Sequence, residues 1–188
     1  MTKQEAMFQM ALIEVGGNPA LAKISHPKGE CYYKGKVFPV IFPQAFVSKI
    51  DALKLLTTKV YDYSFRGVST VKRQWVADYM SVSNVCISFT RRGRELLKQE
   101  FDETYYEQLC KTKFALCPSG DFTWTYRFFE ACACRAIPIV DKECELMRGF
   151  KYYCNYDLDK AWVYDEEMVE HNYQLFRKGH VLSPEKLL

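Results

Sequence analysis

Residues Lys113–Val140, KFALCPSGDFTWTYRFFEACACRAIPIV, decide the fold of this 188-residue chain. Phe114–Cys117 is short and apolar, which is typical of a buried strand, and Pro118–Gly120 follows it with the residue types of a turn. Apolar residues then recur at helical spacing as far as Ala136, and Ile137–Val140 resumes the pattern of a buried strand. The stretch therefore predicts a β-turn-α-β unit, which binds ligands at the carboxyl end of its first strand, beside the helix N-terminus.

Two charged residues, Arg127 and Glu130, lie on this otherwise apolar helix. Ionised side chains are seldom fully buried unless they are paired or bound to a ligand. At a spacing of three they share one face, near Ser119 and Gly120, whose backbone N–H groups we expect to be free at the helix start. An anion such as a diphosphate could bind those N–H groups and Arg127, with Glu130 accepting hydrogen bonds from ribose or sugar hydroxyls. The alternative is an intrahelical ion pair at a partly hydrated helix edge, which contributes roughly a few tenths of a kcal/mol.

The order KFALCPSG…TYRFFEACACRAIPIV resembles the sugar-nucleotide-binding signature of the exostosin-like glycosyltransferases. In that family a strand ends in a Pro-x-Gly turn, an Arg and a Glu follow three apart on a helix, and the next strand has an Ile-Pro-Val core. Upstream, Tyr61–Gly67 followed by Lys72-Arg73 resembles the F-x-G … R element that opens the donor domain of the family. The resemblance covers about Val60–Val140.

This resemblance implies the C-terminal, nucleotide-sugar-binding lobe of a GT-B glycosyltransferase, an enzyme that transfers a sugar to a glycan or other hydroxyl acceptor. Arg73 and Arg127 would hold the diphosphate and Glu130 the ribose, while Ser119 and Gly120 would lie against the phosphates. A UDP-sugar is the donor that the family likeness favours. Transfer in this fold needs no metal and no other cofactor, so none is expected.

Gly67 follows a predicted strand, where a glycine allows the backbone to approach a ligand closely. A plain turn is the alternative, but if Gly67 and Gly120 end strands of one sheet, the two turns flank one cleft. The chain departs from the family after the predicted helix, where Arg135 replaces the usual glycine. A left-handed conformation kept at Arg135 would cost about 1 kcal/mol.

Strands that alternate with helices predict an α/β fold with a Rossmann-like parallel sheet and flanking helices. The sequence pattern predicts helices over 4–15, 44–58, 67–80, 104–112 and 166–178, and strands over 37–42, 61–65, 84–89, 114–117 and 137–140.

Length allows one full domain. We expect residues 60–188 to form the nucleotide-sugar-binding domain, and residues 1–59 to be a helical appendage or a remnant of the acceptor lobe. Because a complete GT-B enzyme has two lobes, the resemblance implies that the chain would be a reduced transferase, a fragment, or a donor lobe that works with a partner chain supplying the acceptor lobe.

Composition indicates a well-packed globular protein, with 48% hydrophobic and 15% aromatic residues. A formal charge of +3 is too small to indicate nucleic-acid binding, and the clusters Lys72-Arg73 and Arg91–Arg94 are more typical of a solvated surface. No run of 18 apolar residues and no signal peptide is present, so a cytoplasmic location is expected. The eight cysteines include no C-x-x-C pair and are interpreted mainly as small buried apolar residues.

A catalytic base is not assigned. His26 is most simply an exposed loop residue, and Asp121 is more typical of a helix N-cap. Three interpretations follow from the sequence: a glycosyltransferase that uses a nucleotide-sugar, a non-catalytic nucleotide-sugar or glycan-binding module that works with a partner chain, and an unrelated α/β protein in which Arg127 and Glu130 are structural.

Overall fold

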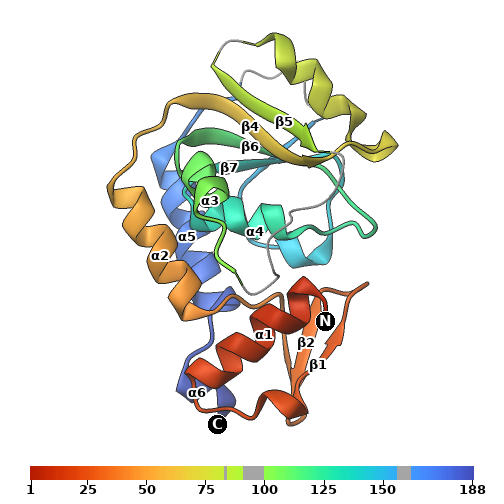
Figure 1. Cartoon of the computed structure of the whole chain (residues 1–188), viewed down its shortest axis with the longest axis vertical. Coiled ribbons are helices and arrows are strands. Elements are labelled where there is room, and N and C mark those ends of the chain that lie inside the picture. Colours follow the sequence, from red (N-terminus) through yellow and green to blue (C-terminus); the bar gives the residue numbers. More distant parts are fainter. Residues whose placement is uncertain (83, 91–99, 156–161) are drawn as a thin grey trace.

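The computed structural model describes residues 1–82, 84–90, 100–155 and 162–188. Within these residues a five-stranded parallel sheet lies at the centre of a larger body, and a three-stranded antiparallel sheet lies beside α1 in a smaller part (Figure 1). The helices are α1 (Lys3–Glu14), α2 (Gln44–Leu55), α3 (Glu103–Cys110), α4 (Tyr126–Ala133), α5 (Glu166–His180) and α6 (Pro184–Leu187), with the 3-10 helices η1 (Pro19–Leu21), η2 (Val71–Ser81) and η3 (Glu145–Met147). The strands are β1 (Lys23–Ser25), β2 (Glu30–Tyr33), β3 (Lys36–Phe38), β4 (Tyr61–Val68), β5 (Val85–Thr90), β6 (Thr112–Cys117), β7 (Ile137–Val140) and β8 (Tyr153–Cys154).

The parallel sheet has the strand order β5-β4-β6-β7-β8. The chain leaves β4 for β5 on one side and then returns to β6 on the other side of β4, so the direction of winding reverses between β4 and β6. In open parallel sheets, ligands bind at the carboxyl ends of the strands at such a switch point. The predicted Rossmann-like α/β fold is confirmed.

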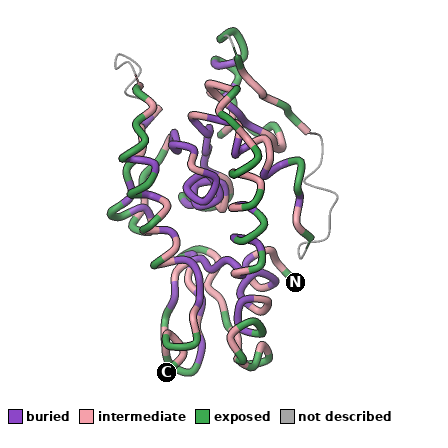
Figure 2. Tube along the Cα trace, turned by 90° about the vertical axis from the view of Figure 1, so that its left-hand side faces the viewer, coloured by how far each residue is buried: buried purple, intermediate pink, exposed green. Residues whose placement is uncertain are grey.

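Alternate residues of β6 serve the two faces of this sheet. Ala115 and Cys117 pack into a core with α2, α3, α4 and α5, whereas Phe114 and Leu116 pack with residues of η2 on the opposite face. Every residue of α4 after Tyr126 is buried, and buried residues gather in the interior of the body (Figure 2). The charged pair predicted on this helix is therefore held inside the protein.

The smaller part, called here the N-terminal module, comprises residues 1–43. Its core contains Phe8, Leu12, Tyr33 and Ile41, joined by Leu182 from near the C-terminus. The expected helical appendage thus also contains the sheet β1-β2-β3. In contrast α2, which was grouped with the appendage, packs in the core of the larger body. The division of the chain at residue 59 stays a prediction.

The helix of the decisive stretch begins later than predicted. Thr125 is the N-cap of α4, and its hydroxyl accepts a hydrogen bond from the Arg127 N–H. The residues from Ser119 to Trp124 form a loop. Asp121 is therefore not the N-cap, and the expected helix start at Ser119 and Gly120 is wrong, because Thr125 supplies the capping side chain five residues further on.

Arg135 keeps the left-handed conformation that a glycine would favour after this helix, with a φ of 56°. The N–H groups of Ala136 and Arg135 bond the carbonyls of Ala131 and Cys132, which is a Schellman motif. The Arg135 side chain also forms an ion pair of 2.6 Å with Asp51. These contacts across the helix end offset the strain that a glycine would avoid, which explains how an arginine is accommodated there.

The cysteines are free thiols, and Cys86 and Cys144 are the two that are only partly buried. Burial raises the pKa of the Cys117 thiol to about 12, as expected for a small apolar residue rather than a reactive one. Among the described residues, no helix combines the length and the apolar character needed to cross a membrane.

Candidate functional site

The site lies where β4 and β6 separate at their carboxyl ends. Pairing between these strands runs as far as Ser64 and Ala115, although both strands continue beyond those residues. Arg127 extends from α4 toward this point, where its Nη2 donates to the Arg66 carbonyl and its Cζ lies 4.4 Å from the centre of the Phe65 ring. The guanidinium is thus fixed at the switch point of the sheet.

Gly67 has a clear role beside this guanidinium. A Cβ atom at Gly67 would lie 3.0 Å from Arg127 Nη2 and 3.0 Å from Phe65 Cζ. The glycine lies within β4 and does not begin a turn into a helix as predicted, because the strand continues to Val68. Its missing side chain leaves space for Arg127.

A second guanidinium, that of Arg73, lies close by. Its Nη1 donates to the Val68 carbonyl at 3.0 Å, and its Nη2 would lie 3.5 Å from a Cβ atom at Gly120. Burial and, after it, the positive charge of Arg127 lower the pKa of Arg73. Within the described residues, Nε of both arginines is buried and has no hydrogen-bond partner. Two neighbouring cations with unsatisfied donors form an arrangement that suits an anion with several oxygens.

Glu130 is fully buried and is surrounded by hydrogen-bond donors. The hydroxyls of Tyr105 and Tyr106 donate to its carboxylate at 2.7 and 3.0 Å, and Lys3 of the N-terminal module forms an ion pair with it. Arg127 therefore extends to β4, whereas Glu130 extends to α3 and α1. A buried carboxylate needs such partners, since desolvation of an unpaired charge is costly.

Ser119 and Gly120 follow β6, but their N–H groups are not free as expected. Asp141, the residue after β7, accepts from both the N–H and the hydroxyl of Ser119 at 2.8 Å. The Gly120 N–H donates to the Phe122 carbonyl at 3.3 Å. The reason is local: these residues lie in a loop that satisfies its own backbone rather than in a helix N-terminus. Their role against phosphates stays a prediction.

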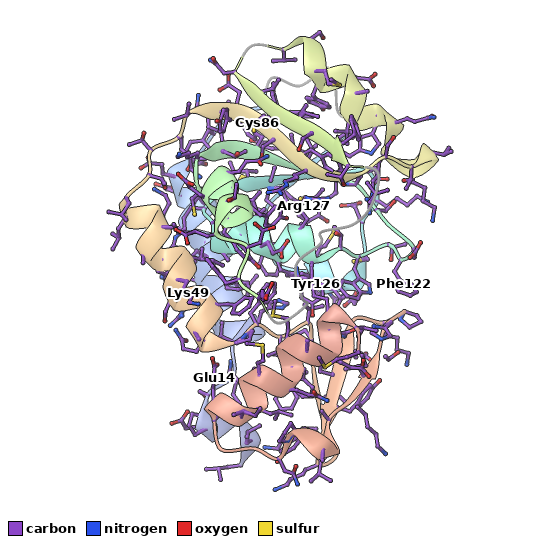
Figure 3. All side chains as sticks on the ribbon, in the orientation of Figure 1. Glu14, Lys49, Cys86, Phe122, Tyr126 and Arg127 are labelled. Atoms are coloured by element: carbon purple, nitrogen blue, oxygen red, sulfur yellow. The ribbon has the colours of Figure 1, made fainter. Side chains whose placement is uncertain are left out.

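A cavity of about 460 Å³ joins these groups and lies between the larger body and the N-terminal module. In Figure 3, Arg127 lies toward the sheet, Tyr126 faces the N-terminal module and Phe122 lies at the outer edge. The side chains that line the cavity and bear on the site are Lys3, His26, Arg73, Asp121, Phe122, Trp124, Tyr126, Arg127 and Glu130, with Gly120 beside them. Four of the six residues predicted for the site thus line one cavity. Of the other two, Gly67 lies beside the Arg127 guanidinium and Ser119 precedes Gly120 in the chain.

Sequence reasoning missed Lys3 and Asp141, because each meets its partner through the fold rather than through local spacing. Tyr105 and Tyr106 bond Glu130 from α3, a contact that the spacing in the sequence does not indicate. Both residues weighed as a base, His26 and Asp121, line the cavity. The His26 carbonyl accepts from Trp124 Nε1 at 2.8 Å. This contact does not assign a base.

Two sequence features lie outside the described residues. One is the basic cluster Arg91–Arg94. The other is Asp157-Leu158-Asp159, an Asp-x-Asp triplet. The expectation of a metal-free site assumed that the chain has no such triplet, and that assumption is wrong.

Comparison with known protein families places the site in a wider context. Residues 44–163, more than half of the chain, match the family described as the RXYLT1 C-terminal domain. The match contains α2 and the strands from β4 to β8, and with them Arg73, Arg127 and Glu130. No curated protein matches the chain significantly.

Proposed function

The chain belongs to the RXYLT1 C-terminal domain family, which is related to the exostosin-like glycosyltransferases, and from this premise we propose that it binds a nucleotide-sugar and transfers the sugar to a hydroxyl acceptor. Membership of this family removes the interpretation as an unrelated α/β protein. In the proposed activity the donor is a UDP-sugar and the acceptor is a glycan or another hydroxyl compound.

The observation that carries this proposal is the pair of guanidiniums at the switch point. Arg73 and Arg127 both keep a buried Nε without a hydrogen-bond partner among the described residues, and both line the cavity. A diphosphate has the charge and the oxygen atoms to satisfy them, because guanidinium binds phosphate oxygens in a bidentate manner. In this proposal Glu130, one helical turn further along α4, accepts hydrogen bonds from hydroxyls of the attached ribose.

The same groups account for the chemistry. When the bond between the sugar and the diphosphate breaks, negative charge develops on the departing nucleoside diphosphate. Guanidiniums that are already fixed next to that charge stabilise the transition state without reorganising. The proposal assigns this role to Arg73 and Arg127 and involves no metal. Ser119 and Gly120 would lie against the phosphates, with Asp141 holding Ser119 in place.

An alternative belongs to a different class: a non-catalytic module that binds the nucleotide-sugar or a glycan and works with a partner chain. The donor site would be the same in that case, with the acceptor supplied by the partner. Transfer or hydrolysis of a sugar nucleotide by the isolated chain separates the two functions, because only the enzyme releases free nucleoside diphosphate.

Calorimetric titration of the chain with UDP, GDP and their sugar derivatives tests the donor site. We expect Arg127→Ala to weaken binding by about 10- to 100-fold, which corresponds to the loss of one charge-assisted hydrogen-bonding group. Glu130→Gln, which keeps the shape of the side chain, should also weaken binding. Arg148→Ala is the matched control, because it removes an arginine whose side chain is 81% exposed.

Nucleotide binding that survives in Arg127→Ala, or that fails equally in Arg148→Ala, would contradict this placement of the diphosphate. A folded wild-type chain that binds no nucleotide would contradict the donor site itself.

A further inference from the structure

Lys3 and Glu130 are 127 positions apart in the chain and form an ion pair in the cavity. Lys3 is the first residue of α1, and the capping box of Thr2 and Glu5 fixes the start of this helix. The Lys3 ammonium also lies 4.6 Å from the centre of the Tyr126 ring, and its side chain remains 27% exposed. The N-terminal module thus places one cation directly on the buried carboxylate of the donor site.

The partners of Glu130 hold this carboxylate in one orientation. Tyr105 and Tyr106 donate to its two oxygens from α3, and Lys3 contacts Oε1 from α1. An ammonium has donors only and an ionised carboxylate has acceptors only. A hydroxyl both donates and accepts hydrogen bonds, so it can donate to the Glu130 carboxylate and accept from the Lys3 ammonium. Two adjacent hydroxyls can use both groups at once.

We propose that Lys3 completes, together with Glu130, the subsite for the vicinal hydroxyls of the donor ribose, and so determines the preference for a ribonucleotide over a 2′-deoxyribonucleotide. The inference rests on the proposed function, in which Glu130 faces the ribose and the arginines face the diphosphate. Lys3 lies outside the residues that match the family, so the N-terminal module adds a specificity-determining residue to the family domain. The module is then part of the donor site and not an appendage.

The test is calorimetric titration of the full chain with UDP and 2′-deoxy-UDP, or with GDP and 2′-deoxy-GDP if the guanine nucleotide binds more tightly. We expect the wild type to bind the ribonucleotide about tenfold or more tightly, as one charge-assisted hydrogen bond allows. Lys3→Met should bring the affinity for the ribonucleotide down to that for the deoxynucleotide, whose own affinity stays unchanged. Lys3→Arg should restore most of the preference, because it keeps a cationic donor. Lys23→Met, an exposed lysine of the same module, is the control for net charge.

Lys3→Met leaves a buried carboxylate without its cation and can unfold the chain, since removing one partner of a buried ion pair is strongly destabilising. The double variant Lys3→Met/Glu130→Gln avoids the uncompensated charge and should fold and show no ribose preference.

Four results would overturn the inference. Equal binding of the two nucleotides by the wild type shows that the protein does not recognise the vicinal hydroxyls of the ribose. An equal loss of both in Lys3→Met shows a general electrostatic or structural effect. Tighter binding in Lys3→Met shows that Lys3 blocks the site. Retention of the ribose preference in the double variant places the diol elsewhere. These results leave the proposed binding of the diphosphate by Arg73 and Arg127 and the proposed sugar transfer intact, although the first and the fourth also remove the ribose role of Glu130. A wild type that binds neither nucleotide removes both proposals.

Discussion

At the scale of single residues, the site depends on one absent side chain. Gly67 lies in β4, and a Cβ atom at this position would crowd Arg127 Nη2. The Phe65 ring packs against the same guanidinium. Glycine is therefore required here for space and not for backbone freedom, since its φ lies outside the left-handed region. The position of Arg127 is set by β4 as much as by its own helix.

Gly67→Ala should displace the Arg127 guanidinium and weaken UDP binding by about tenfold, while overpacking lowers the free energy of unfolding by about 1 kcal/mol. Titration with UDP and urea unfolding measure the two effects. Gly179→Ala is the control: a Cβ atom there meets no atom within 4 Å, and alanine inside α5 should stabilise the chain by about 0.5–1 kcal/mol. Unchanged affinity in Gly67→Ala would show that the position of Arg127 is unimportant for binding.

At the scale of elements, the loop between β6 and α4 is tied to the end of β7. Asp141 bonds the N–H and the hydroxyl of Ser119 at once, so two neighbouring strand ends are joined through one carboxylate. The loop that carries Gly120 and Phe122 along the cavity starts from this anchor. Hydrogen bonds to a carboxylate are stronger than those between neutral groups.

Asp141→Ala removes both bonds and should lower the free energy of unfolding by about 2 kcal/mol, whereas Ser119→Ala removes only the hydroxyl bond and should cost about 1 kcal/mol. Asp141→Asn keeps one carbonyl acceptor and should fall between them. Urea unfolding of the three variants gives the order. If Asp141→Ala proves no less stable than Ser119→Ala, the backbone bond does not anchor the loop.

At the scale of the whole molecule, His180 lies at the junction of the two parts. Its Nδ1 donates to the Val40 carbonyl at 2.7 Å, its backbone carbonyl accepts from the Phe42 N–H, and its ring stacks on Phe176. Burial lowers the pKa of His180 to about 4, although the hydrogen bond to Val40 acts in the opposite direction. The junction therefore requires a neutral imidazole.

The stability of the chain should depend on pH through this group. The unfolded chain binds a proton at His180 near pH 6.5 and the folded chain only near pH 4. The stabilisation is thus fully present above pH 6.5 and is lost as the pH falls toward 4, by about 3 kcal/mol in total. Urea unfolding at intervals between pH 7 and 4 measures it. His180→Gln should flatten this part of the profile and His171→Gln, at an exposed position, should not. Identical profiles for wild type and His180→Gln would contradict the assignment.

The sequence alone determined the local features of this protein. The apolar runs around Pro118–Gly120 predicted a parallel α/β sheet with a helix packed on it, and the fold has both features. The reason is that strand and helix periodicity arise from residues close together in the chain. The ligand site expected beside the helix start stays a prediction. Four predicted site residues line one cavity, because η2, α4 and the loop after β6 come together near the carboxyl ends of β4 and β6.

Only the tertiary structure decided what each of these residues contacts. Lys3 reaches Glu130 from another part of the molecule, Asp141 occupies the Ser119 N–H that was expected to be free, and Gly67 leaves space for the Arg127 guanidinium. No local spacing encodes these contacts, since they depend on how helices and modules pack and on which buried polar group satisfies another. The elements follow from the sequence pattern, whereas the partners of the buried charges follow from the packing.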